Sequence, residues 1–168
     1  MAFALILILL CKQSTPASLT HLNPPRPIAM NNLPKDFKPI TLQHIFNLAV
    51  TEFLVNDAPP AVEDESCRYI TSDGRKCAVG LALPDRHQAQ LCRQGFPAIA
   101  HDYPELFDKD VHCCSVDGLR YFQSMLHDEL QHSGKWEMTK EARARKYKQV
   151  AKGFNLNLPD NFPGDQNA

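Results

Sequence analysis

Hydrophobic positions recur with a helical period directly after Thr41, which is a favourable N-cap residue. The apolar positions have the spacing i, i+3, i+4, i+7, i+8 and i+11, and they are Leu42, Ile45, Phe46, Ala49, Val50 and Phe53. Ile40, before the cap, is expected to pack on Ile45 and fix the direction in which the chain enters the helix. Two consecutive prolines follow shortly after Asn56, so the pattern predicts a helix that ends near that residue.

Two more helical stripes occur in the C-terminal third of the chain. Asp117 is the expected N-cap of the first, and Ser133-Gly134 ends it. Its inward side chains are expected to be Leu119, Phe122, Leu126 and Leu130, widened by Tyr121 and Met125. Thr139 is the expected N-cap of the second helix, which stops at Gly153. Its inward side chains are expected to be Tyr147, Val150, Ala151 and Phe154, and Trp136 is expected to fill the gap between the two helices.

Between these stripes the chain has the pattern of a β-hairpin. Asp73-Gly74 offers two residues that tolerate a positive φ angle, between two short runs of strand-forming side chains. A loop of two residues places Ile70 opposite Cys77, whereas a loop of three residues places Thr71 there. At about 3.3 Å per residue, the sulfur atoms of Cys67 and Cys77 are expected to lie on the order of 10 Å or more apart in either register.

This separation argues against a bond between the two thiols. A disulfide needs Cα atoms within roughly 7 Å, and two thiolates that share one zinc ion come comparably close. We therefore expect Cys67 and Cys77 to be separate, packed thiols. The six cysteines, at positions 11, 67, 77, 92, 113 and 114, show no regular disulfide framework, and this favours a reducing compartment.

The segment after the hairpin has weaker signals. Asp85 is expected to cap a short helix that ends at Gly95. Further on, the rings of Phe96, Tyr103 and Phe107 are expected to pack over the core from an irregular stretch with one or two helical turns. The range 108–117 is expected to be a loop, and its His112-Cys113-Cys114 sequence lacks the partners of a metal site. The predicted fold is α+β and mostly helical, with three to four amphipathic helices packed around one small antiparallel β-hairpin.

The two ends of the chain have a different composition from the middle. Residues 1–10 are almost wholly apolar, but a membrane span needs about 20 such residues. We expect residues 1–39 to be a proline-rich arm outside the globular domain, with Met30 as an alternative initiator. A secretory signal over Met1–Ala17 is the alternative, although Pro16 lies inside its cleavage site. A single globular domain is expected over 40–158 and a disordered tail over 159–168. With 43% hydrophobic and 22% charged residues and a net charge of −1, the composition suits such a domain in the cytoplasm.

At several of these residues, the sequence resembles a family of short uncharacterised proteins of bacteria and their tailed phages. The matching residues are Cys67, Tyr69, Gly74, Lys76-Cys77-Ala78-Val79-Gly80, Pro84-Asp85, Leu126-His127-Asp128 and Trp136. They follow the family pattern C-x-Y, G-x-K-C-A-V-G, I-P-D, L-H-D and W, although Leu83 stands where the family has Ile. The resemblance implies no established activity, cofactor or substrate. It does imply that the His127-Asp128 face of its helix contacts another element, a ligand or a partner.

The charges of the last helix suggest where a partner could bind. Between Lys135 and Lys152 there are seven basic residues and two acidic ones. The face expected to point outward carries Arg145, Lys148 and Lys152, with Arg143 and Lys146 beside it. A solvated surface is the default interpretation of such a run. The functional interpretation is a non-catalytic interaction protein that binds an unknown partner protein through this face or through His127 and Asp128. Nucleic acid is the alternative ligand, but no aromatic side chains alternate with the charges.

Two chemical alternatives compete with the interaction protein. In the first, Cys77 is the nucleophile of a thiol-dependent hydrolase, His127 is its base, and Asp85 or Asp128 orients the base. In the second, Cys77 or Cys67 binds a metal ion together with His127 and Asp85. The sequence has no phosphate-binding loop, dinucleotide fingerprint, paired zinc motif or G-x-S-x-G motif, so no cofactor and no metal are expected.

Overall fold

The computed structural model describes residues 33, 35–59, 61–63, 66–84, 95–127 and 138–164, without the side chains of Ser66 and His127. Several predictions concern residues outside this set. They are the signal peptide over Met1–Ala17, the initiator Met30, the helix capped by Asp85, and the placement of Cys11, Cys92, Asp128, Leu130 and Trp136.

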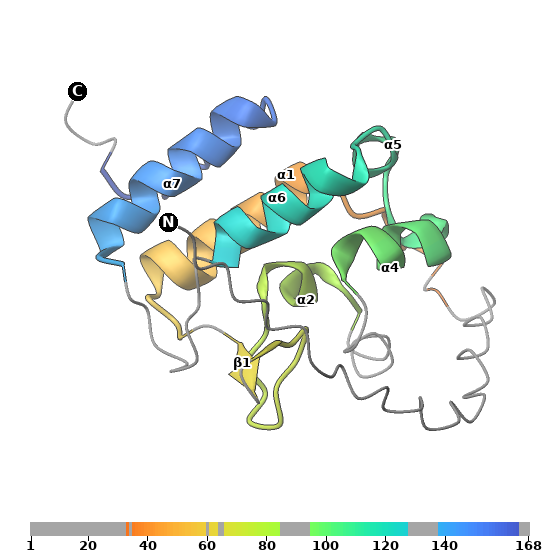
Figure 1. The fold of residues 1–168 in the computed structure, drawn as a ribbon, viewed down its shortest axis with the longest axis horizontal. Coiled ribbons are helices and arrows are strands. Elements are labelled where there is room, and N and C mark those ends of the chain that lie inside the picture. Colours follow the sequence, from red (N-terminus) through yellow and green to blue (C-terminus); the bar gives the residue numbers. More distant parts are fainter. Residues whose placement is uncertain are drawn as a thin grey trace, which may run out of the picture.

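The described part of the chain is mainly helical, as predicted. Helix α1 (Leu42–Ala49) runs behind α6 (Val116–His127) in the view of Figure 1, with α7 (Lys140–Gly153) on one side of this pair and α2 (Ala78–Ala82) and α4 (Phe96–Asp102) on the other. Helix α6 contacts α2, α4 and α7, and α1 contacts α2. The apolar side chains that face one another across these contacts form one continuous core. No helix among the described residues has the length and the apolar character that crossing a membrane requires.

The first predicted helix is confirmed, including its cap. The Thr41 hydroxyl accepts a hydrogen bond from the backbone N–H of His44, and all six predicted inward side chains are buried. The prediction missed a change of winding, because the chain continues as a π-helix, η2 (Val50–Val55). Asp57 then adopts a positive φ of 54°, which ends the helical run. Ile40 is buried in the same core as Ile45, and its backbone pairs with Phe107 in an isolated parallel bridge.

The predicted hairpin exists only as a turn. The two strands of the described chain, β1 (Val62–Glu63) and β2 (Ser66–Cys67), form an antiparallel pair before it. At the turn, a single bridge joins Ile70 to Lys76, and Gly74 has a φ of 86°. The loop therefore comprises residues 72–74, one position earlier than the predicted three-residue loop, and both predicted registers are wrong.

Helix α2 replaces the predicted second strand. The chain turns into this helix at Cys77, whose sulfur accepts a hydrogen bond from the N–H of Gly80 at 3.3 Å. A Cβ atom on Gly80 would lie 2.0 Å from the carbonyl oxygen of Tyr69, so only glycine allows α2 to pack this closely on the preceding segment. The short helix is thus fixed by a thiol cap and by a close backbone contact. Neither feature is as easy to recognise in a sequence as an amphipathic stripe.

The segment between α2 and α6 has more helix than predicted. After α4 come a 3₁₀ turn, η3 (Pro104–Leu106), and helix α5 (Lys109–His112), which lies inside the range predicted to be a loop. The rings of Phe96, Tyr103 and Phe107 are buried, as predicted. Asp110 accepts a hydrogen bond from the N–H of Leu42 at 3.0 Å, so α5 satisfies a terminal donor of α1.

The second predicted stripe is confirmed over α6, with two corrections. The side chains of Leu119, Phe122 and Leu126 are buried and Met125 packs against the core, but Tyr121 is about half exposed at 51%. The helix begins at Val116 because Ser115, and not Asp117, is its cap. The Ser115 hydroxyl accepts a hydrogen bond from the N–H of Gly118 at 3.0 Å.

The last predicted helix is also confirmed, but the tail after it is not. Tyr147, Val150 and Ala151 are buried and Phe154 is half-buried in α7, which ends at Gly153. The segment after α7 continues along the body of the molecule, and the side chain of Phe162 is only 3% exposed. The prediction that a disordered tail begins at residue 159 is therefore wrong, because the core extends beyond the predicted boundary at residue 158.

Candidate functional site

One concave feature formed by described residues lies beside α7. It is a groove of about 350 Å³ between the outer side of α7 and the end of the C-terminal segment, residues 155–164. Its walls are Lys140, Glu141, Ala144, Arg145, Lys148, Pro163 and Gly164. Three of these seven residues are cationic and one is anionic. We call this feature the α7 groove.

The α7 wall of the groove is a helix with a local N-terminal cap. The hydroxyl of Thr139 accepts a hydrogen bond from the N–H of Ala142 at 3.3 Å, as its position in the sequence predicts. The pKa of Glu141 lies below its usual value, first because its backbone N–H donates to the carboxylate, then because Thr139 does, with smaller contributions from Arg145 and Lys140. The groove therefore contains, beside the N-terminus of α7, a carboxylate that stays ionised at neutral pH.

The other wall comes from the C-terminal segment, which folds back along the outside of α1 and η2. Asn155 has a φ of 53°, which lets the chain reverse after α7. Gln43 of α1 exchanges two hydrogen bonds with the backbone of Asn157, at 2.8 and 2.9 Å. Further along, the Asn161 amide donates to the Thr51 hydroxyl at 3.1 Å. These contacts anchor the segment at two points of the helical run 42–55, one in α1 and one in η2.

One ring joins this segment to the basic face of α7. Phe162 is buried, and the ammonium group of Lys148 lies 5.6 Å from the centre of its ring. This distance is within the range of a cation–π contact. Lys148 is therefore held at the groove by the segment that sequence reasoning assigned to the tail.

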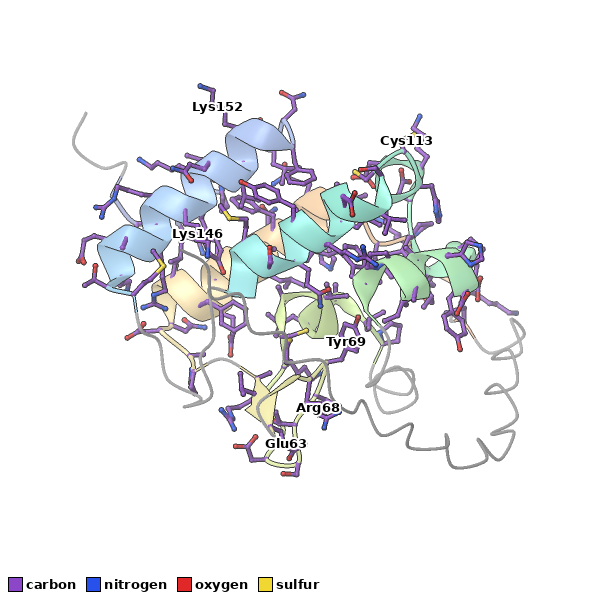
Figure 2. The ribbon with its side chains drawn as sticks, in the orientation of Figure 1. Glu63, Arg68, Tyr69, Cys113, Lys146 and Lys152 are labelled. Atoms are coloured by element: carbon purple, nitrogen blue, oxygen red, sulfur yellow. The ribbon has the colours of Figure 1, made fainter. Side chains whose placement is uncertain are left out.

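The structure brings together some of the predicted basic residues and separates others. Arg145 and Lys148 line the groove with Lys140, which the prediction counted among the basic residues but did not assign to the site. Lys152 is exposed one turn further along α7 and extends away from the neighbouring helices in Figure 2. It does not line the groove, although it adds positive charge to the same helix.

Arg143 is not part of the exposed face, which corrects its predicted role in binding. It is only 3% exposed and crosses the interface between α7 and the end of η2. Its guanidinium donates to the carbonyl oxygen of Phe53 at 2.8 Å and to the carboxylate of Asp57. Lys140 also donates to a carbonyl of this helix end, that of Val55, at 3.3 Å. Cations near open carbonyls at a helix C-terminus are favourable, so these contacts join α7 to η2.

The residues of the His127-Asp128 face cannot be assigned to the groove. His127 is the last residue of α6, and its side chain is not described. Asp128 and Asp85 lie outside the described residues. The predicted binding role of His127 and Asp128, and their roles in the two chemical alternatives, therefore remain predictions.

The two thiols of the predicted hairpin are much closer together than the sequence indicated. Cys67 is one of the groups that raise the pKa of the Cys77 thiol, so the two side chains are neighbours, and neither is in a disulfide. The predicted separation assumed a regular strand from Cys67 onward, whereas β2 ends at Cys67 and the chain bends before the turn. The expectation of two separate thiols is wrong for this reason.

Cys77 lacks the environment of a catalytic nucleophile. Its side chain is fully buried, and this burial, followed by the hydrogen bond with Cys67, raises the pKa of the Cys77 thiol well above its usual value. A thiol nucleophile needs the opposite shift, because the thiolate is the reactive form. The structure therefore disfavours the thiol-dependent hydrolase at Cys77.

The His112-Cys113-Cys114 sequence falls at the end of α5 and shows no grouped ligands. The ring of His112 contacts the carbonyl oxygen of Pro104 at 3.1 Å, and the Cys114 thiol donates to the carbonyl of Asp110 at 3.4 Å. Across the described ranges, no three His, Cys, Asp or Glu side chains come close enough together to hold a metal ion.

Comparisons with known proteins add no residue to the site. No family model, no curated protein and no solved structure matches this chain. The evidence for a function therefore comes from the charges, the groove and the packing of the described residues.

Proposed function

We propose that this protein is a small non-catalytic interaction protein that binds an acidic segment of a partner protein in the α7 groove. The observation that carries the proposal is the meeting of Lys140, Arg145 and Lys148 at one concave surface. Charge complementarity at such a surface steers the encounter with a partner and selects its sign of charge.

The charge distribution of the chain supports an acidic partner. The range 138–164 holds six basic and two acidic residues, whereas the rest of the chain holds twelve basic and seventeen acidic residues. The overall net charge of −1 therefore hides a basic C-terminal part. Because Lys140 and Arg143 also bind carbonyls of η2, this basic part is held on the body of the molecule rather than on a separate arm.

The lining of the groove favours a peptide over a nucleic acid. No aromatic side chain lines it, so it offers no surface on which bases could stack. Ala144 and Pro163 provide apolar surface between the charges, which suits an apolar side chain next to carboxylates. The carboxylate of Glu141 repels a continuous polyanion but tolerates a peptide whose charges are spaced apart.

The test is a binding titration by fluorescence anisotropy. A fluorescein-labelled peptide of alternating Glu and Leu residues and a labelled single-stranded oligonucleotide are titrated with the full chain. The double variant Arg145→Glu/Lys148→Glu should bind the peptide about tenfold more weakly, because each exposed charge contributes up to about 1 kcal/mol. The matched control is Lys38→Glu/Lys109→Glu, which makes the same change of net charge at two exposed lysines outside the groove.

Two results would contradict the proposal. Equal weakening by the groove variant and the control would show that only net charge matters. Tighter binding of the oligonucleotide than of the peptide, with the same dependence on Arg145 and Lys148, would assign the groove to nucleic acid instead. The expected result is peptide binding that falls steeply with added salt and is lost selectively in the groove variant.

We also propose that the chain belongs with the short bacterial and phage proteins that it resembles, and that it acts in the cytoplasm. In support of the first point, three residues that carry the resemblance form one packed unit, in which Cys77 donates its N–H to the carbonyl of Tyr69 and Gly80 packs on that same carbonyl. In support of the second point, none of the four cysteines that the structure describes is in a disulfide.

A further inference from the structure

The charges that line the α7 groove from the helix side follow one stripe and change sign once. Glu141, Arg145 and Lys148 occupy the positions i, i+4 and i+7, which lie on one side of a helix. All three residues are exposed. At a rise of about 1.5 Å per residue, Arg145 lies about 6 Å and Lys148 about 10.5 Å beyond Glu141 along the axis. The stripe therefore has an anionic end beside the N-terminus of α7 and a cationic end further along.

Glu141 and Arg145 carry charges that the described part of the chain does not pair. Within the described ranges, no ion pair involves either residue, although they stand four positions apart on one helix. Lys140, the neighbour of Glu141, is directed towards another helix, because its ammonium group donates to the carbonyl oxygen of Val55 at 3.3 Å. The groove thus presents one carboxylate and two cations, in a fixed order, to a ligand.

We propose that Glu141 fixes the direction in which an acidic segment lies in the α7 groove, by binding a lysine or arginine at one end of that segment. A direction of binding presupposes the proposed function, because it concerns the same groove and the same class of ligand. A continuous polyanion would place a carboxylate against Glu141, and like charges that face each other weaken binding. The ligand class is therefore an acidic segment with one cationic end, whose carboxylates lie beside Arg145 and Lys148.

The spacing of the stripe fits an extended peptide. Alternate side chains of an extended chain lie on the same side and repeat about every 6.6 Å, which is close to the rise of about 6 Å between Glu141 and Arg145. The second carboxylate of a Lys-x-Glu-x-Glu peptide falls about 3 Å beyond the level of Lys148, a difference that the long lysine side chain can span. Ala144 and Pro163 supply apolar surface on which the uncharged side chains between the charges can pack.

The experiment is a competition against the labelled peptide of alternating Glu and Leu residues, bound to the full chain. Three unlabelled pentapeptides with blocked ends each carry one Lys and two Glu, separated by Leu, and the Lys is first, central or last. Their composition and net charge are the same, so they differ only in the position of the cation. We expect the better of the two end-Lys peptides to displace the labelled peptide at about fivefold lower concentration than the central-Lys peptide, which is the effect of one exposed ion pair.

Two variants assign this preference to one side chain. Glu141→Gln keeps the size of the side chain and removes its charge, so the end-Lys and central-Lys peptides should then compete equally within about twofold. A pentapeptide with three Glu residues should bind this variant more tightly than it binds the natural chain. The matched control is Asp117→Asn, which makes the same change of charge in the first turn of α6, outside the groove. It should leave the preference unchanged.

The results distinguish a failure of the direction from a failure of the proposed function. If no peptide binds through Arg145 and Lys148, the proposed function is wrong and the direction is wrong with it. If the labelled peptide binds through these two residues but the end-Lys and central-Lys peptides compete equally well, only the direction is wrong. A preference for an end-Lys peptide that persists in Glu141→Gln would also overturn the proposal, because another group would then bind the cation.

Discussion

The buried guanidinium of Arg143 provides the sharpest test of how α7 is attached to the body of the molecule. We consider the substitution Arg143→Met, which keeps a long unbranched side chain in the core but removes the charge and every donor. The variant loses the bond to the Phe53 carbonyl at 2.8 Å and the ion pair with the carboxylate of Asp57. The Asp57 side chain is 58% exposed, so water can solvate it once the arginine is gone.

The magnitude follows from these contacts. A hydrogen bond to a charged group contributes about 1.5–3 kcal/mol, and a buried carbonyl that loses its donor costs about 1–3 kcal/mol. The methionine regains part of this, because burying the guanidinium itself costs desolvation free energy. We therefore expect the free energy of unfolding to fall by about 2–4 kcal/mol. The variant Arg143→Lys should fall in between, because an ammonium keeps the charge but cannot reproduce the planar fork.

The assay is equilibrium unfolding in urea, followed by circular dichroism. For a slope of about 2 kcal/mol per molar urea, the midpoint of Arg143→Met should move down by about 1–2 M without a change in slope. The matched control is Arg145→Met, two positions along the same helix but exposed in the groove, and its free energy of unfolding should change by less than about 0.5 kcal/mol. If the two variants have equal stability, Arg143 does not join α7 to η2 and the reasoning is refuted.

Three further predictions follow from the packing. Gly80→Ala should lower the free energy of unfolding by more than about 2 kcal/mol in the same urea assay, because its Cβ would meet a backbone carbonyl oxygen at 2.0 Å. Gly153→Ala, whose Cβ meets nothing within 4 Å at the end of α7, should be neutral or stabilising by up to about 1 kcal/mol, and equal losses in the two variants would disprove the close contact. Phe162→Ala should lower the free energy of unfolding, measured by thermal unfolding, by about 3–5 kcal/mol, because the side chain of Phe162 is buried in the core. A loss below about 0.5 kcal/mol, the size expected for a surface substitution, would show that the C-terminal segment does not belong to the core. The pKa of the Glu141 carboxyl, measured by NMR titration, should lie below its usual value and should rise in Thr139→Ala. Because the pKa is lower in the folded protein, the ionised carboxylate stabilises the fold above the unfolded pKa, and this stabilisation is lost as the pH falls through the folded pKa. An unchanged pKa in Thr139→Ala would contradict the contribution assigned to Thr139.

The features that the sequence predicted well are those whose cause lies within a few residues. The caps at Thr41 and Thr139 each bond to an N–H three positions further along, and the apolar stripes repeat at a helical period. A reader of the sequence sees both partners of such an interaction at once. The same local logic gave the wrong cap for α6, because the sequence pattern favoured Asp117, whereas the Ser115 hydroxyl, two positions earlier, accepts the N–H of Gly118.

The features that it did not predict depend on partners far along the chain. Arg143 looked like one more member of a basic surface, but its acceptors lie 86 and 90 positions away at the end of η2. The proline, glycine and asparagine residues of the C-terminal segment carry no periodic pattern, and for this reason the sequence predicts a tail there. Its contacts with Gln43 and Thr51 become visible only when the chain has folded back.

By itself, the sequence determined that this chain forms three amphipathic helices, two of them with their caps, and that its last helix is basic, because periodicity, capping and charge are local properties. Only the tertiary structure decided which of those basic side chains face a groove, which one is buried in an interface, and how close Cys67 comes to Cys77. These outcomes depend on where separate segments meet in space. A difference of one residue in a turn, or a reversal of the chain after a helix, changes them without changing the local pattern.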